Sequence, residues 1–255
     1  MIKAIFFDID GTILSTKSHT VLPGTVKAFD VLHKKGIRTF ISSGRPMVLI
    51  PQMPVTFDGY ITVNGGYCFA GDDVVLRKPI HPDDCLRWLQ YVEENDMTTM
   101  CFTDKEMFIN RIDEPTLRLH DELGFQMPPM LPLDTMKGRE VYQFIAMQPA
   151  SKDAEVLSRL SHSRMPRWHP AFSDLIPADS SKAVGIECLL NHFGISREET
   201  MAFGDGANDI EMLEYVATGI AMGNASDLVK SHADYITDTS DNEGIAKALS
   251  HLAII

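Results

Sequence analysis

The chain has 255 residues, enough for one large domain or two modest ones that fold without disulfides or structural metals. Its 23 lysines and arginines against 35 aspartates and glutamates give a formal net charge of −12, which repels nucleic acid and anionic membranes at long range. No apolar run approaches the roughly 18 residues of a membrane span, and Asp8 interrupts the start too early for a signal peptide. We therefore expect a cytoplasmic protein that binds neither nucleic acid nor membrane. The four cysteines show no metal-binding spacing, and we expect them to be reduced.

The first predicted element is a strand at residues 2–7, a nearly continuous apolar run typical of a strand covered on both faces of a parallel sheet. It ends at the motif Asp8-Ile9-Asp10-Gly11-Thr12. A helix is predicted over 23–35, with Gly36 at its C-cap, and a second strand over 37–42. A third run, at 60–63, leads into a predicted hairpin through 74–76.

The middle of the chain, residues 80–178, differs from the rest in its pattern of predicted helices and short strands. It is bounded by two polar junctions that contain proline, which are typical of domain boundaries. It is predicted to hold helices at 83–94, 115–123 and 151–160 and strands at 98–102, 107–110, 141–147 and 174–176. We interpret it as a smaller α/β domain inserted into a first domain made of residues 1–79 and 179–255.

The last part of the chain resumes the alternation of strands and helices. The predicted elements are a helix at 181–193, a strand at 200–203, a helix at 208–216, a strand near 219–222 and two more elements at 233–237 and 244–252. Strands and helices of these lengths indicate an α/β fold with a doubly wound, Rossmann-like, mostly parallel sheet. Such sheets bind ligands at the carboxyl ends of their strands.

The first candidate site group is the pair Asp8 and Asp10. Residues two apart in an extended chain point to the same side, so both carboxylates can address one ligand, although a turn stabilised by local hydrogen bonds is an equally good interpretation. An EF-hand is excluded, because the glycine falls at position four of the loop and His19 stands where glutamate is required.

Two further predicted loops offer anion-binding groups. Ser43 and Gly44 lie where the second strand is expected to give way to a helix, and an ordinary helix cap is the competing interpretation. Lys182 lies just inside a predicted helix N-terminus, where the helix dipole disfavours a cation unless an anion is bound nearby. The competing interpretation is a solvated surface lysine, which is the usual explanation for a lysine at such a position in other proteins.

The fourth loop, residues 204–209, follows an apolar strand. It differs from a dinucleotide fingerprint because Asp209 stands where glycine or alanine is required. Its carboxylates are better suited to a cation. Asp8, Asp205 and a backbone carbonyl are the hard oxygen ligands that Mg²⁺ accepts while it keeps waters and a substrate phosphate.

These motifs occur in the order found in the haloacid dehalogenase superfamily, which the sequence resembles over nearly its whole length. The segments 221–225 and 241–245 are also similar to those of the Cof-type branch, and the position of residues 80–178 resembles an inserted cap of type C2B. The closest resemblance is to bacterial sugar-phosphate phosphatases. Ser43 stands where many relatives have threonine, and Ala183 where glycine is frequent, and neither change removes a catalytic group.

The resemblance implies roles for individual residues. Asp8 would be the nucleophile that forms an aspartyl phosphate, and Asp10 the general acid and base. Asp8, the Asp10 carbonyl and Asp205 would hold Mg²⁺, with Asp209 orienting these ligands from behind. The groups implied for binding the phosphoryl group are Ser43, Gly44, Lys182 and Asn208, although capping of a turn or helix explains Asn208 almost as well.

The predicted function is therefore Mg²⁺-dependent hydrolysis of a small phosphorylated metabolite, most of all a hexose phosphate, by a monomer or weak homodimer. A phosphosugar mutase and a non-enzymatic phospho-acceptor switch stay open as alternatives. Within the inserted segment, residues 167–172 could meet a sugar, but packing of Trp168 and Phe172 in the core of that domain is the simpler interpretation.

Overall fold

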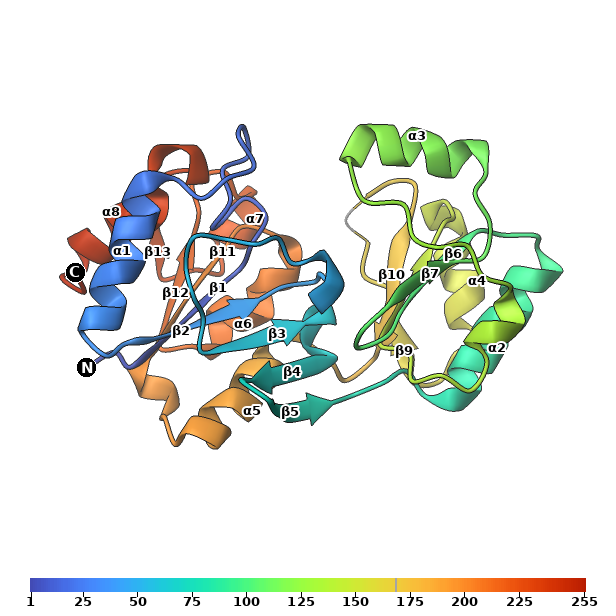
Figure 1. Ribbon diagram of the computed structural model, residues 1–255, viewed down its shortest axis with the longest axis horizontal. Coiled ribbons are helices and arrows are strands. Elements are labelled where there is room, and N and C mark those ends of the chain that lie inside the picture. The colour runs from blue at the N-terminus through green and yellow to red at the C-terminus, as the bar shows by residue number, and fades with distance from the viewer. Residues whose placement is uncertain (168) are drawn as a thin grey trace. The chain divides into compact units, whose positions relative to one another are not determined.

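The computed structural model describes residues 1–167 and 169–255. The chain forms two compact units, each with its own sheet (Figure 1). The larger unit comprises Met1–Arg45, Ile50–Arg77 and Ser181–Ile255, and the smaller unit comprises Pro46–Leu49 and Lys78–Ser180.

The larger unit is built on an eight-stranded sheet, in the order β13-β12-β11-β1-β2-β3-β4-β5. The strands from β13 to β3 run parallel, and β4 and β5 add an antiparallel hairpin at one edge. Their bounds are β1 Ala4–Phe7, β2 Arg38–Ser42, β3 Gly59–Thr62, β4 Tyr67–Ala70, β5 Asp73–Arg77, β11 Thr200–Gly204, β12 Thr218–Ala221 and β13 Tyr235–Ile236. From β1 the chain adds β2 to β5 on one side, and it later adds β11 to β13 on the other side. The strand order therefore reverses beside β1, and sheets of this kind bind ligands at such a reversal.

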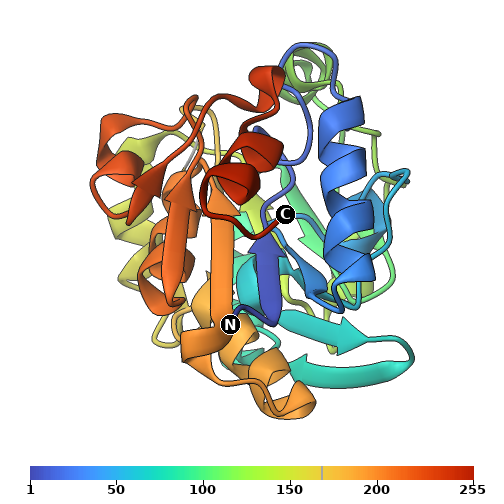
Figure 2. The same cartoon turned by 90° about the vertical axis from the view of Figure 1, so that its left-hand side faces the viewer.

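Helices cover both faces of this sheet because β1 is apolar on both sides. Ile5 and Phe7 pack on one face with helices α1 (Pro23–Lys34) and α8 (Gly244–His251), which contact each other (Figure 2). Ala4 and Phe6 pack on the other face with α5 (Lys182–Phe193), α6 (Ile210–Tyr215) and the short α7 (Asp227–Lys230). The four residues of β1 are all buried, as the continuous apolar run predicts.

The smaller unit holds a five-stranded antiparallel sheet, in the order β7-β6-β8-β10-β9. Its strands are β6 Thr99–Phe102, β7 Met107–Ile109, β8 Gln143–Ala146, β9 Ser163–Arg164 and β10 Ser173–Pro177, and its helices are α2 Pro82–Glu94, α3 Glu114–Leu123 and α4 Asp153–Leu157. Helices α2 and α4 pack on the sheet around Trp88, Phe144 and Val156.

The predicted fold class, a doubly wound α/β sheet, is confirmed. Two helices differ from their predicted bounds by more than one residue. The segment expected at 208–216 begins with a 3₁₀ turn, Ala207–Asp209, before α6, and the segment expected at 151–160 is a 3₁₀ turn, Ala150–Lys152, followed by the short α4. The two-residue β9 and the helix α7 have no periodicity long enough to predict.

Two expectations from composition have counterparts in the structure. No helix among the described residues is both long and apolar enough to cross a bilayer. The four cysteines carry free thiols, and burial raises the pKa of Cys85 and of Cys101 to about 12, so both stay protonated.

Candidate active site

Three candidate residues follow neighbouring parallel strands of the larger sheet. Asp8 follows β1, Ser43 follows β2 and Asp205 follows β11, and β1 pairs with both of the others. Because parallel strands end at the same edge of a sheet, these three residues lie at one rim.

Lys182 reaches this rim from the first turn of α5. The helix begins there because the Ser181 side chain accepts a hydrogen bond from the Val184 N–H. The Lys182 side chain is fully buried, and its ammonium donates to Asp8 Oδ1 at 2.6 Å and to Asp209 Oδ1 at 2.5 Å. Burial by itself would lower the pKa of Lys182, but the two carboxylates raise it above its ordinary value. The lysine is therefore a fixed positive charge beside Asp8.

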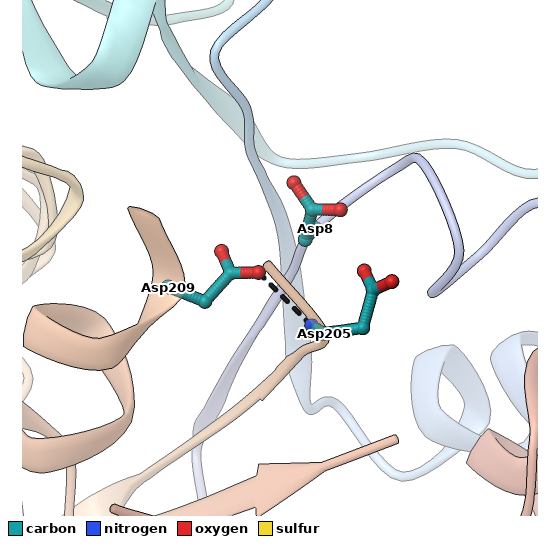
Figure 3. A group of neighbouring side chains, drawn as sticks. All are labelled: Asp8, Asp205 and Asp209. Atoms are coloured by element: carbon teal, nitrogen blue, oxygen red, sulfur yellow. Dashed lines mark hydrogen bonds between the residues drawn. The ribbon is translucent and has the colours of Figure 1, made fainter. Parts of the chain in front are cut away.

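Asp209 holds the loop that carries Asp205. Its Oδ2 accepts the N–H groups of Asp205 at 3.0 Å and of Gly206 at 2.8 Å, and the first of these bonds is drawn in Figure 3. Gly204 has no room for a side chain, since a Cβ there would come within 2.5 Å of the Asp209 carboxyl carbon. One buried carboxylate thus fixes both the loop and Lys182.

The three carboxylates of Asp8, Asp205 and Asp209 form a cluster in which one oxygen of each lies within 4.8 Å of the others (Figure 3). Burial raises the pKa of Asp8 well above its ordinary range, against the opposing effect of Lys182, and Asp209 and Asp205 raise it further. Burial and then Asp209 raise the pKa of Asp205 to about 6. These shifts mean that one ammonium does not balance three carboxylates. The cluster fits a divalent cation with oxygen ligands, such as Mg²⁺.

Asp10 lies at the same rim but is more than half exposed. Its two carboxylate oxygens accept hydrogen bonds from Arg45 Nε at 2.7 Å and Nη2 at 2.8 Å, a bidentate ion pair. The Asp10 bond raises the pKa of Arg45 above its ordinary value, against the opposing effect of burial. Arg45 lies two residues after Ser43, but the sequence carries no local signal that its side chain pairs with Asp10.

The remaining predicted residues, Ser43, Gly44 and Asn208, lie in the same unit. The Ser43 hydroxyl is buried and accepts a hydrogen bond from the Arg45 N–H at 3.1 Å. Asn208 Nδ2 donates to Asn64 Oδ1 at 3.0 Å, and a Cβ at Gly44 would lie 3.1 Å from the same oxygen. Asn64, which has a φ of 54°, is a neighbour that sequence reasoning passed over as part of a hairpin turn.

Two more residues that sequence reasoning left without a role contact Asp205. Thr12 Oγ1 donates to Asp205 Oδ1 at 3.2 Å, and Asn224 Nδ2 donates to Asp205 Oδ2 at 2.9 Å. Both belong to motifs noted in the sequence, but only the tertiary structure brings them to this carboxylate.

In the segment 167–172, Arg167 makes hydrogen bonds within the smaller unit. The guanidinium of Arg167 donates to both oxygens of Asp153 and to backbone carbonyls, and Phe172 is buried. Trp168 lies outside the described residues. The burial of Phe172 agrees with the packing interpretation for that residue.

Comparison with known proteins gives consistent matches over the whole chain. A family model described as haloacid dehalogenase-like hydrolase matches residues 5–249. YkrA of Bacillus subtilis (strain 168), whose name marks it as a candidate phosphatase, is 29% identical over 257 residues, which cover 99% of this chain and 98% of that protein.

Two solved structures are similar throughout. One is BT4131, described as a sugar phosphatase of subclass IIB of the haloacid dehalogenase superfamily, with 36% identity, a TM-score of 0.91 and coverage of 99% of this chain and all of that one. The other is BT1666 from Bacteroides thetaiotaomicron, described among the phosphatases of the same superfamily, with 33% identity, a TM-score of 0.93 and coverage of 100% and 96%.

Proposed function

The chain belongs to the haloacid dehalogenase-like hydrolase family, and we propose that it hydrolyses small phosphomonoesters, in the first place hexose phosphates, with Mg²⁺ and through an aspartyl phosphate on Asp8. The family match and the phosphatase relatives confirm the resemblance and the prediction of an enzyme, a phosphatase of this superfamily. The substrate, the cation and the covalent intermediate are our proposal.

The observation that carries the proposal is the position of Asp8 between a buried ammonium and two carboxylates. In the proposed reaction an Asp8 oxygen attacks phosphorus, and the bond from phosphorus to the substrate's oxygen breaks. Lys182 stabilises the negative charge that develops on the phosphoryl oxygens, where a fixed donor is most effective. A carboxylate nucleophile divides one difficult displacement into two easier steps.

Asp10 would move the protons. It gives one to the departing alcohol and later takes one from the water that attacks phosphorus and releases Asp8 and inorganic phosphate. In the structure both Asp10 oxygens are bound to Arg45, so this ion pair has to open before Asp10 can reach the substrate.

The cation would be held by the carboxylates of Asp8 and Asp205 and the Asp10 carbonyl, with Asp209 keeping the loop in place. When bound, Mg²⁺ neutralises charge on the phosphoryl group and draws the nucleophile and phosphate together. Ser43, the backbone at Gly44, Lys182 and Asn208 would bind the phosphoryl oxygens. The buried ammonium of Lys182 beside Asp8 supports this assignment.

We further propose that residues 80–178 act as the cap that selects the substrate, with residues 1–79 and 179–255 forming the catalytic domain. The separate core around Trp88 and Phe144 supports an independent domain. A cap that closes over the rim would exclude water and read the part of the substrate beyond phosphate. The description of BT4131 as a sugar phosphatase supports hexose phosphates as the first class to test.

The test is a screen of phosphorylated metabolites, with inorganic phosphate measured in the presence of Mg²⁺ and in EDTA. We expect continuous release from at least one sugar phosphate, none in EDTA, and none from Asp8→Asn. Isomerised sugar phosphate without phosphate release would instead indicate a mutase. A stable acyl phosphate without turnover would indicate a phospho-acceptor switch.

A further inference from the structure

Asn224 lies in the loop after β12, and its side chain joins three segments that are far apart in the sequence. Nδ2 donates to the Gly11 carbonyl and to Asp205 Oδ2, each at 2.9 Å. Oδ1 accepts the Ser240 N–H at 3.0 Å. The amide thus uses both N–H groups and its carbonyl oxygen within the larger unit.

The Asp205 carboxylate is held in one orientation by its surroundings. Besides Asn224 on one oxygen, Thr12 donates to the other at 3.2 Å. The carboxylate packs directly on Gly11, where a Cβ would come 2.2 Å from Asp205 Oδ2, and Gly11 has a φ of +74°. The Asp205 carboxylate therefore has little freedom to rotate.

The Ser240 contact connects this carboxylate to a second set of bonds. Asp241 accepts hydrogen bonds from the hydroxyls of Ser15 and Thr16, and Glu243 accepts the N–H groups of Gly24 and Thr25. The segment 240–243 is therefore fastened to the part of the chain that follows Asp8 and Asp10. Asn224 connects this segment to Asp205, because it accepts the Ser240 N–H and donates to the Asp205 carboxylate.

From these contacts we propose that Asn224 is a positioning residue for the cation, acting through Asp205. The inference rests on the cation site of the proposed function, but not on the substrate or the reaction. Only a neutral amide suits the position. Aspartate would add a fourth carboxylate and lose both donors, and lysine would place a competing positive charge beside the site. Residues that orient metal-binding carboxylates in this way typically affect metal affinity by about 10–100-fold.

The test measures binding of Mn²⁺, a spectroscopic substitute for Mg²⁺, to the full-length protein by calorimetry and electron paramagnetic resonance. We expect the Kd to rise by about 10–100-fold in Asn224→Ala and at least as much in Asn224→Asp. The matched control is Asn95→Ala, since Asn95 Nδ2 donates to the Tyr91 carbonyl at 2.9 Å in the smaller unit, and its Kd should equal that of the wild type.

A second measurement separates positioning from a general loss of structure. In Asn224→Ala, the Mg²⁺ concentration for half-maximal phosphatase activity should rise by the same factor, and kcat should recover at saturating Mg²⁺. A purely structural role would lower thermal stability and activity at every Mg²⁺ concentration. If Asn224→Ala does not fold, Asn224→Ser decides the question, because it keeps a short donor but cannot reach both partners.

The outcomes distinguish this inference from the proposed function. An unchanged Mn²⁺ Kd in a folded Asn224 variant overturns the positioning role, even if the wild type is an active phosphatase. Weakened Mn²⁺ binding in a protein that hydrolyses no phosphomonoester supports the positioning role and overturns the proposed function. A wild type that binds no Mn²⁺ overturns both.

Discussion

Buried carboxylates in the two units of the molecule have opposite electrostatic environments. In the smaller unit, Asp84 accepts hydrogen bonds from the Ser161 and His162 N–H groups and from the Ser163 hydroxyl, at 2.8 to 3.1 Å. Burial alone would raise the pKa of Asp84, but these bonds lower it below its ordinary value. In the larger unit, burial and Asp209 raise the pKa of Asp205 to about 6.

Asp153, also in the smaller unit, resembles Asp84 in having a lowered pKa. Arg167 donates to both of its oxygens, and the pKa of Asp153 is lowered by these bonds in spite of burial. Both carboxylates there have their charge balanced by the protein and hold the chain together. The cluster of Asp8, Asp205 and Asp209 keeps an excess of negative charge, which marks a binding site. The difference teaches that a candidate functional site is found where neighbouring carboxylates outnumber the cations that would balance them.

The most severe test of this comparison is to remove Lys182, whose ammonium pairs with two carboxylates of the cluster. Lys182→Met should reduce kcat/KM for the best phosphomonoester by about a hundredfold to a thousandfold. The reason is that the change removes a fixed donor from the place where negative charge develops. The control is Lys137→Met in the smaller unit, an exposed lysine paired with Asp134. Equal activity of the two variants would show that Lys182 has only a structural role.

The next effect tests the smaller unit. Asp84→Asn should lower the free energy of unfolding by about 2–3 kcal/mol, because a neutral amide cannot accept three hydrogen bonds as well as a carboxylate does. Urea unfolding at pH 7 measures this. Since the pKa of Asp84 is lowered in the folded state, the difference from wild type should shrink as the pH falls below about 4. Mg²⁺ affinity should not change, and a change would contradict the separation of roles.

A pH series tests the excess charge in the cluster. Because the pKa of Asp205 is raised in the folded state, the stability linked to its protonated form is present below about pH 4 and is lost as the pH rises through about 6. A cation binds the ionised form and restores stability. Saturating Mg²⁺ should therefore stabilise the protein by about 2 kcal/mol at pH 7.5 and by much less at pH 5, measured by thermal unfolding. Asp205→Asn should lose this dependence.

The smallest effect sharpens the comparison within the larger unit. Glu243 accepts hydrogen bonds from the Gly24 and Thr25 N–H groups at 2.7 Å and so caps α1 from far along the chain. Glu243→Gln should cost about 1 kcal/mol of unfolding free energy, since one oxygen acceptor is lost. Glu155→Gln, in an exposed pair with Lys152, should change the free energy of unfolding by much less. If both variants lose the same small amount, the remote cap is unimportant.

The alternation of apolar strands and amphipathic helices could be read from the chain alone. Continuous apolar runs such as residues 2–7 occur in strands that are covered on both faces, and parallel strands end at one edge of their sheet. Asp8, Ser43 and Asp205 each follow such a run. Their position at one rim thus follows from local patterns and from the general rules of this architecture.

Other contacts depend on loop conformations and have no local signal. The partners Arg45 and Asp10 are 35 residues apart, and Asn224 and Gly11 are 213 apart. No periodicity or cap pattern specifies such pairs, because each is made by side chains whose direction is set only after the sheet has formed. The same holds for Asn208, whose partner Asn64 follows a different strand.

By itself, the sequence determined the fold class and the strand ends that carry the site, because hydrophobic periodicity and turn residues act over a few neighbours. Only the tertiary structure decided which buried charges are balanced and which are not. That balance depends on donors brought from distant segments, as at Asp84 and Asp205, and it separates the carboxylates that hold the fold from those that can bind a cation.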